Sequence, residues 1–123
     1  MSTLWASKLG AEGERLAAEY LEKHGYVILA RNYRCRHFGE LDIIARNGAV
    51  LAFIEVKTRA TYLYGRPCEA VTRGKQKKIY RCAEYYMQQN GISSSMPQLS
   101  FDVIEIIMEG TRVREFKHYP ACF

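Results

Sequence analysis

Two charged residues follow the most apolar stretch of the chain. The run from Ala49 to Ile54 leads directly into Glu55 and, two residues later, Lys57. Residues two apart in a β-strand lie on the same face, roughly 6.5 Å apart along the chain, so this pair would point the same way as Phe53. A carboxylate and an ammonium at the end of a buried strand can form a solvated ion pair. They can also serve as a metal ligand and a group that handles water or phosphate.

A second carboxylate, Asp42, lies in the alternating segment GELDIIAR, just before the hairpin signal Asn47-Gly48. A two-residue turn at that signal places Asp42 opposite Leu51 to Phe53, on the same face as Glu55. Two converging carboxylates repel each other unless a cation neutralises them. Mg²⁺ (or Mn²⁺) prefers such oxygen ligands, and metal-assisted phosphodiester hydrolysis is the chemistry that these residue types indicate.

Positive charge gathers close to these residues. The net charge is +5 with a pI near 9.1, and the segment from Lys57 to Arg81 holds eight basic residues but one acid, Glu69. Such a concentration favours a polyanionic partner, such as a nucleic acid, although a solvated helix face would have the same composition. The basic side chains that we predict to contact a phosphodiester backbone are Arg59, Arg73, Lys75, Lys77 and Lys78.

Periodicity predicts the elements that must position these groups. Apolar residues at helical spacing indicate one helix over Ser7–His24 and a second from Thr72, as N-cap, to Gln89. The remaining segments predict strands at residues 26–33, 39–46 and 49–58 and a final pair around Glu109-Gly110. The order α-β-β-β-α-β-β predicts an α/β fold in which a mixed central sheet is flanked by helices.

Composition narrows the class of protein. The chain has 123 residues, which predicts a single domain. Its longest apolar run is far shorter than the roughly 20 residues of a membrane span, and its N-terminus lacks a secretory signal, so we expect a cytoplasmic protein without a membrane partner. The cysteines show no zinc-ligand spacing, and we expect four reduced thiols; they are Cys35, Cys68, Cys82 and Cys122.

Five blocks in order carry a family resemblance: GAEGERLAAEYLEKHGY, GELDII, FIEVKTR, YGRPCEAVTRGKQKKI and FDVIEI. They resemble the YraN family of predicted endonucleases, within the PD-(D/E)xK nuclease superfamily and related to archaeal Holliday-junction resolvases. The resemblance covers nearly the whole chain. It implies a restriction-endonuclease-like core, one nuclease-like domain over residues 1–123, and cleavage of DNA, including branched or structured DNA.

The resemblance also implies roles for individual residues. Asp42 and Glu55 match the metal-binding acids, and Lys57 matches the lysine that activates or positions the attacking water. Glu14 matches an additional acid of the resolvase branch, as a further metal ligand, and Gln76 matches a polar helix position beside the site. From the residues alone, Glu14 could equally be an exposed acid of the helix. Gln76 could equally be a solvated polar residue.

Some features depart from the pattern or have no assigned role. Leu41 precedes Asp42 where the superfamily motif has proline. Glu40 is either a supporting acid or an exposed one, whereas Asp102 is expected to be structural and Tyr86 to lie in the core. The other tyrosines among the basic residues could stack on bases; they are Tyr62, Tyr64, Tyr80 and Tyr85.

Two further classes of function remain open at this point. The chain could be a catalytically silent nucleic-acid-binding module of the same fold, or a protein-interaction adaptor whose basic face meets an acidic partner. By analogy with junction resolvases, which make two symmetric cuts, a homodimer is a further expectation.

Overall fold

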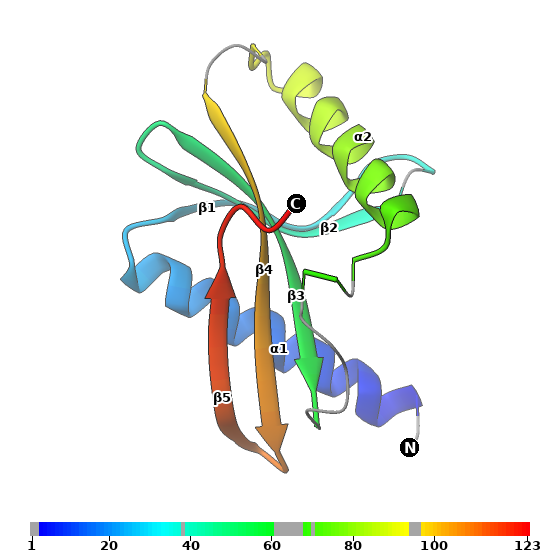
Figure 1. Ribbon diagram of the computed structural model, residues 1–123, viewed down its shortest axis with the longest axis vertical. Helices are drawn as coiled ribbons and strands as arrows, with labels where there is room; N and C mark the ends of the chain where they lie inside the picture. The colour runs from blue at the N-terminus through cyan, green and yellow to red at the C-terminus, as the bar shows by residue number, and fades with distance from the viewer. Residues whose placement is uncertain (1–2, 38, 61–67, 70, 94–96) are drawn as a thin grey trace.

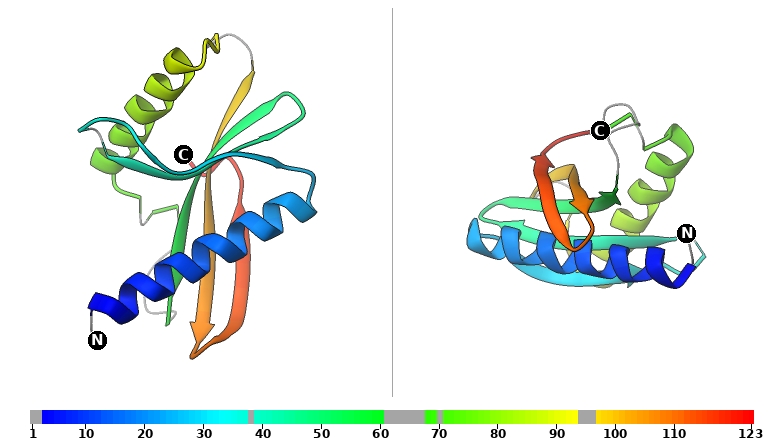
Figure 2. Two further views of the ribbon diagram at one scale, coloured as in Figure 1. Left: turned by 180° about the vertical axis from the view of Figure 1, so that it is seen from behind. Right: turned by 90° about the horizontal axis from the view of Figure 1, so that it is seen from below.

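A five-stranded sheet lies between two helices, one on each face (Figure 1; Figure 2). The computed structural model describes residues 3–37, 39–60, 68–69, 71–93 and 97–123. The elements are α1 (Thr3–Lys23), β1 (Val27–Arg34), β2 (Glu40–Asn47), β3 (Val50–Arg59), α2 (Arg73–Gln89), β4 (Gln98–Glu109) and β5 (Arg112–Tyr119). The predicted order and the mixed α/β class are confirmed.

The strands lie in the order β1-β2-β3-β4-β5. The first three form an antiparallel meander, β3 and β4 are parallel, and β5 returns antiparallel to β4. Parallel neighbours need a crossover connection, and α2 provides it between β3 and β4. This crossover carries the basic helix over the face of the sheet towards which Phe53 points.

The register between β2 and β3 differs from the prediction. The hairpin turn occupies residues 48–49, with Gly48 at φ 60°, and Asn47 pairs with Val50. Because Asn47 stays in the strand, the pairing shifts along β3 and ends with Ile43 opposite Ile54. Asp42 therefore comes opposite Glu55, rather than opposite Leu51 to Phe53. The two carboxylates still share a face, as predicted.

Each face of the sheet has its own apolar layer. Residues of α1 such as Leu21 pack with Ile43 and Ile54, whereas residues of α2 such as Tyr86 pack with Phe53 on the other face. Adjacent strand residues thus serve opposite layers, as the period of two requires. Burying a large apolar side chain contributes about 1.5–3 kcal/mol to the stability of the fold. The two layers together hold both helices against the sheet. The predicted core position of Tyr86 is confirmed.

The helix ends follow ordinary capping rules. Thr72 is the N-cap of α2, as predicted, and its hydroxyl accepts a hydrogen bond from the Lys75 backbone N–H at 3.2 Å. Helix α1 begins at Thr3, four residues before the predicted start, and is followed by Gly25 at φ 88°. A glycine in this left-handed conformation is a common helix stop. None of the described helices is long and apolar enough to cross a membrane.

The cysteines are paired, so the expectation of four reduced thiols is wrong. Disulfides join Cys35 to Cys82 and Cys68 to Cys122, with Cα–Cα distances of 5.3 and 5.4 Å, which fall within the usual range. The partners are 47 and 54 residues apart in sequence. No local spacing could indicate such pairs, because only the folded sheet brings them together.

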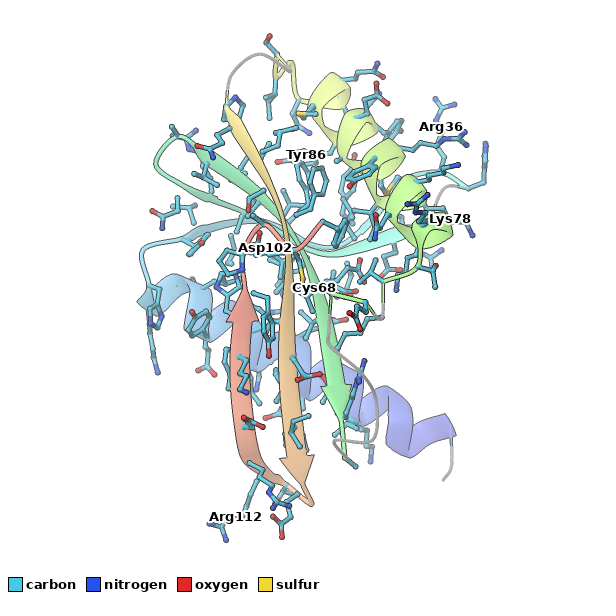
Figure 3. The ribbon with its side chains drawn as sticks, viewed as in Figure 1. Arg36, Cys68, Lys78, Tyr86, Asp102 and Arg112 are labelled. Atoms are coloured by element: carbon cyan, nitrogen blue, oxygen red, sulfur yellow. A yellow bond between two sulfur atoms is a disulfide. The ribbon has the colours of Figure 1, made fainter. Side chains whose placement is uncertain are left out.

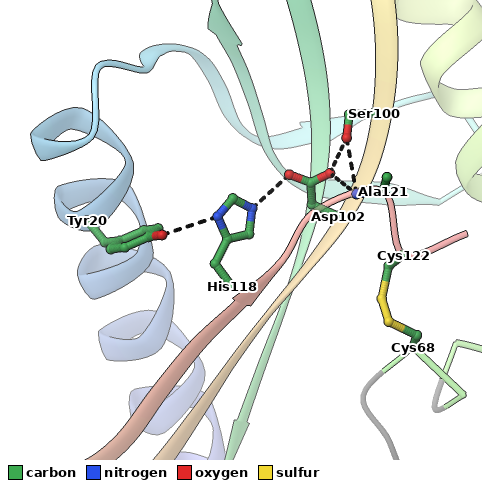
Figure 4. A network of polar contacts seen from close by, with 7 residues as sticks. All are labelled: Tyr20, Cys68, Ser100, Asp102, His118, Ala121 and Cys122. Carbon is green, nitrogen blue, oxygen red and sulfur yellow. Dashed lines mark hydrogen bonds and ion pairs between the residues drawn. A yellow bond between two sulfur atoms is a disulfide. The ribbon is translucent and has the colours of Figure 1, made fainter.

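Asp102 has the structural role expected of it. Its buried carboxylate accepts hydrogen bonds from Ser100 Oγ at 2.5 Å and from the Ala121 backbone N–H at 3.1 Å (Figure 4). It also lies 2.8 Å from His118 Nε2, and His118 Nδ1 lies 3.3 Å from the Tyr20 hydroxyl. The network therefore ties α1, β4, β5 and the C-terminal segment to one another.

One close contact fixes how deeply α1 lies against the sheet. Gly13 is buried, and a Cβ at this position would overlap the side chain of Thr58 in β3. Only a residue without a side chain allows the helix backbone this approach. Glu14, the next residue, is thereby held beside the C-terminal end of β3.

We predict that Gly13→Ala destabilises the protein by about 1–3 kcal/mol, because overpacking at a tight contact forces the backbone or Thr58 to shift. Chemical denaturation measures the effect. Gly10→Ala is the matched control in the same helix, since a Cβ there meets nothing within 4 Å, and alanine should stabilise the helix by up to about 1 kcal/mol. Equal effects of the two substitutions would contradict the close approach.

Candidate active site

The candidate site lies where β2 and β3 separate. Their pairing ends with Ile43 and Ile54, and Asp42 and Glu55 are the next residues on each strand. The Asp42 carboxylate accepts a hydrogen bond from the Val56 backbone N–H, with Oδ2 2.8 Å from the nitrogen. A side-chain oxygen thus accepts the hydrogen bond that a strand carbonyl would otherwise accept. This bond fixes the orientation of Asp42 at the fork, the point where β2 and β3 separate.

The two carboxylates destabilise each other. Glu55 is only 3% exposed, and burial, followed by the negative charge of Glu55, raises the pKa of Asp42 to about 6. The hydrogen bond from Val56 and the positive charges of Lys75 and Lys57 act in the opposite direction. The fold therefore holds two acids together at a clear electrostatic cost, as functional sites often do.

Two lysines lie beside these acids. Lys57 lies two residues beyond Glu55 on β3, and burial, together with the charge of Lys75 and a hydrogen bond with it, lowers the pKa of Lys57. Lys75 approaches from the first turn of α2, and its Nζ lies 3.2 Å from Glu55 Oε2. Burial alone would lower the pKa of Lys75, but Glu55 and the hydrogen bond with Lys57 raise it.

Sequence reasoning missed this position of Lys75. The basic cluster predicted a phosphate contact for Lys75, whereas the structure pairs its ammonium with a proposed metal ligand. One signal was available: a lysine in the first turn of a helix lies at the positive end of the helix dipole, where acids are favoured.

Glu14 reaches the site from α1. Burial, then the negative charge of Asp42, raises the pKa of Glu14, and a hydrogen bond with Asn32 opposes the rise. Glu40, which also raises this pKa, is exposed, with its Oε2 3.8 Å from Arg34 Nε. The structure thus brings Glu14 near Asp42, and its role as a metal ligand stays a prediction.

Gln76 and Arg59 have other partners. The Gln76 side-chain amide donates a hydrogen bond to the Val71 carbonyl at 3.0 Å, within the segment that enters α2. Arg59 Nη1 lies 3.8 Å from Glu105 Oε2, and both side chains are largely buried. These contacts therefore give no direct support to the predicted role of Gln76 beside the site. They give none to the predicted role of Arg59 as a phosphate contact either.

The remaining predicted contacts to nucleic acid lie on the surface of α2. Arg73, Lys77 and Lys78 are exposed, and Figure 3 shows Lys78 on this helix. The first turn of α2 contains no acid, so the positive charge of the side chains adds to that of the helix N-terminus. Of the four tyrosines predicted to stack on bases, Tyr80 is exposed and Tyr85 is half-buried, whereas Tyr62 and Tyr64 lie outside the described residues.

The acids fit a hard divalent cation that completes its coordination with water. Glu55 Oε1 is buried, and no described group of the protein hydrogen-bonds to it, which is unusual for a buried carboxylate oxygen. Among the described residues, no three side chains of His, Cys, Asp or Glu form a ready set of ligands. Mg²⁺ commonly uses one or two carboxylates and several waters. Asp42 and Glu55 would therefore provide enough protein ligands for such an ion.

Comparison with known proteins gives the family. Residues 13–106 match the family described as "Uncharacterised protein family UPF0102". The chain belongs to the UPF0102 family. The matched span contains Glu14, Asp42, Glu55 and Lys57, which are the predicted acids and the lysine, and also Lys75.

Relatives within the UPF0102 family resemble most of the chain. A UPF0102 protein of Clostridium botulinum (strain Loch Maree / Type A3) is 48% identical over 100 residues, covering 81% of this chain and 80% of that protein. A UPF0102 protein of Alkaliphilus metalliredigens (strain QYMF) is 45% identical over 103 residues, covering 84% and 88%. These names give the family and no activity.

The pKa of Asp42 predicts how stability depends on pH. The folded protein holds the proton up to about pH 6, whereas the unfolded chain releases it near 3.8. Stability from this group is therefore full below pH 3.8 and is lost as pH rises to about 6. Without metal, we expect the free energy of unfolding of the wild type, relative to Asp42→Asn, to fall by up to about 3 kcal/mol.

Urea denaturation in EDTA at pH 4 to 7 measures this difference. Asparagine keeps an oxygen that can accept the Val56 N–H, so the comparison removes the titrating group without removing the hydrogen bond. A difference that stays constant across this range would show that the pKa of Asp42 is not raised.

Proposed function

We propose that this protein is a divalent-metal-dependent endonuclease that hydrolyses phosphodiester bonds of DNA. The observation that carries the proposal is the fork between β2 and β3. There Asp42 and Glu55 lie opposite each other, Glu55 Oε1 is buried without a hydrogen-bond partner among the described residues, and Lys57 follows on the same face. A fold tolerates like charges in this way where a cation neutralises them.

Asp42 and Glu55 would hold the cation, and Glu14 would approach it from α1. Mg²⁺ or Mn²⁺ bound there would supply Lewis-acid chemistry, by polarising the scissile phosphate and lowering the pKa of a water. The hydrogen bond from Val56 keeps the Asp42 carboxylate in one orientation, which favours a defined position for its partner.

Lys57 would handle the attacking water. Its pKa is lowered by burial and by Lys75, so a larger fraction of its amine is neutral, and free to accept a proton, than in an exposed lysine. As a hydrogen-bond donor it would also stabilise charge that develops on the phosphate. Both roles require Lys57 to share a face with Glu55, and strand spacing ensures this.

The exposed basic residues of α2 would bind the DNA backbone beside the acids. Arg73, Lys77 and Lys78 lie in the first two turns of this helix, the helix that also brings Lys75 to Glu55. A DNA strand along this surface would pass the carboxylates at the fork. Charge–charge contacts of this kind give affinity without sequence preference, which suits a substrate defined by its shape, such as branched DNA.

The acids favour a nuclease over the two alternative functions. A silent DNA-binding module or an adaptor for an acidic protein partner would gain nothing from a buried and a half-buried carboxylate side by side, because these repel a phosphate or an acidic surface. Their pairing at a fork beside a basic helix is better explained by metal-dependent catalysis.

We predict that the protein cleaves DNA in Mg²⁺ or Mn²⁺ and that Asp42→Asn, Glu55→Gln and Lys57→Met each reduce the rate by roughly 10²–10⁴-fold, because each removes a ligand or the water-handling group. Linear, nicked, flap and four-way-junction DNA should be compared. Glu22→Gln, which removes an exposed acid of α1, controls for the loss of charge and should leave the rate unchanged. Cleavage that survives all three substitutions would refute the assignment, and binding without cleavage would favour the silent module.

We also predict that Arg73→Glu/Lys77→Glu weakens DNA binding and reduces the slope of log affinity against log salt concentration by about 2, since each phosphate contact contributes about 0.9. Fluorescence anisotropy in EDTA measures binding without cleavage. Lys23→Glu/Arg112→Glu has the same change in charge at exposed positions away from α2, and Figure 3 shows Arg112 near the opposite end of the molecule. An unchanged slope in the α2 variant would favour the adaptor.

A further inference from the structure

Lys75 occupies a position that helix formation by itself does not favour. It is the third residue after the N-cap Thr72, whose hydroxyl accepts its backbone N–H. At this position a glutamate or glutamine commonly completes the cap, and a positive side chain opposes the helix dipole. The placement of a lysine here therefore needs an explanation outside the helix.

The explanation lies in the contact with Glu55. The Lys75 Nζ lies 3.2 Å from Glu55 Oε2, and the two side chains are very differently exposed, at 43% and 4%. A buried carboxylate without a counter-ion is strongly destabilising. Lys75 supplies the counter-ion from the solvent side, where its long side chain can leave Glu55 for water while Glu55 stays buried.

The remaining oxygen of Glu55 has no such partner. Oε2 contacts the ammonium, whereas buried Oε1 has no hydrogen bond within the described part of the chain. The contact with Lys75 thus neutralises the charge of Glu55, but it leaves Oε1 without a hydrogen bond among the described residues. A divalent cation carries more charge than an ammonium and binds carboxylate oxygens directly, so the two compete for the same group.

We propose that Lys75 is a displaceable internal counter-ion of the metal site: its ammonium neutralises Glu55 when the site holds no metal, and a divalent cation displaces it from Glu55. This inference rests on the proposed function. Once displaced, Lys75 lies on the same helix as Arg73 and Lys77, where a DNA phosphate would be its next partner. Lys75 is then a positioning residue that couples occupancy of the metal site to the charge available for DNA.

Titration of the purified protein with Mn²⁺ at pH 8, followed by calorimetry, tests the inference without measuring cleavage. We expect Lys75→Met to bind Mn²⁺ about tenfold more tightly than the wild type, because the metal no longer competes with an ammonium; coupling of this size is usual between linked sites. Lys75→Arg keeps the charge and should not gain affinity. Lys23→Met, which removes an exposed charge at the end of α1, should bind like the wild type.

Thermal unfolding of the same variants provides a second measurement. Without metal, Lys75→Met should unfold at a lower temperature than the wild type, because Glu55 loses its counter-ion. With saturating Mn²⁺ the difference should disappear. The effect of Lys75→Met without metal should also vanish in a Glu55→Gln background, where no charge needs neutralising.

The possible outcomes separate the two proposals. If the wild type binds no Mn²⁺, or if Asp42→Asn binds it as tightly as the wild type, the metal site and the proposed function fail together. If the wild type binds Mn²⁺ through Asp42 while Lys75→Met binds it equally or more weakly, only the role of Lys75 is overturned. Tighter binding by Lys75→Met together with its lower stability without metal supports the inference.

Discussion

The hydrogen bond from the Val56 N–H to the Asp42 carboxylate is the interaction on which the candidate site depends. Where two strands separate, their backbone donors lose their partners, and a buried donor without a partner is costly. Asp42 satisfies one such donor at the end of the β2–β3 pairing. The same bond holds the carboxylate opposite Glu55, so a single residue both ends the ladder and forms the site.

The site is electrostatically unfavourable by itself, and the apolar layers on both faces of the sheet compensate for it. Burial and the charge of Glu55 raise the pKa of Asp42, while Lys57 and Lys75 supply nearby positive charge that offsets part of this effect. The layer beneath α1 brings Glu14 to the fork through the close packing of Gly13. The layer beneath α2 brings Lys75 to the same place.

Contacts outside the candidate site hold α2 in that position. The Asp102 network fixes the end of β5 and the C-terminal segment against β4 (Figure 4). The disulfide between Cys122 and Cys68 then joins this segment to the stretch that leads into α2, and Cys82 ties the helix itself to Cys35 at the end of β1. The position of the Lys75 ammonium therefore depends on the whole frame of the sheet.

The sequence by itself determined the order of elements, the opposite faces of Phe53 and Ile54, and the Thr72 cap, because strand period, helix period and capping are local. It also indicated Asp42 and Glu55 as a pair. Only the tertiary structure decided their register, the contact of Lys75 with Glu55 and the pairing of the cysteines. The register depends on which residues the turn leaves paired. The contact of Lys75 and the cysteine pairs depend on where the crossover helix and the other distant segments pack. The local sequence carries no signal of these, because the residues that meet are far apart along the chain.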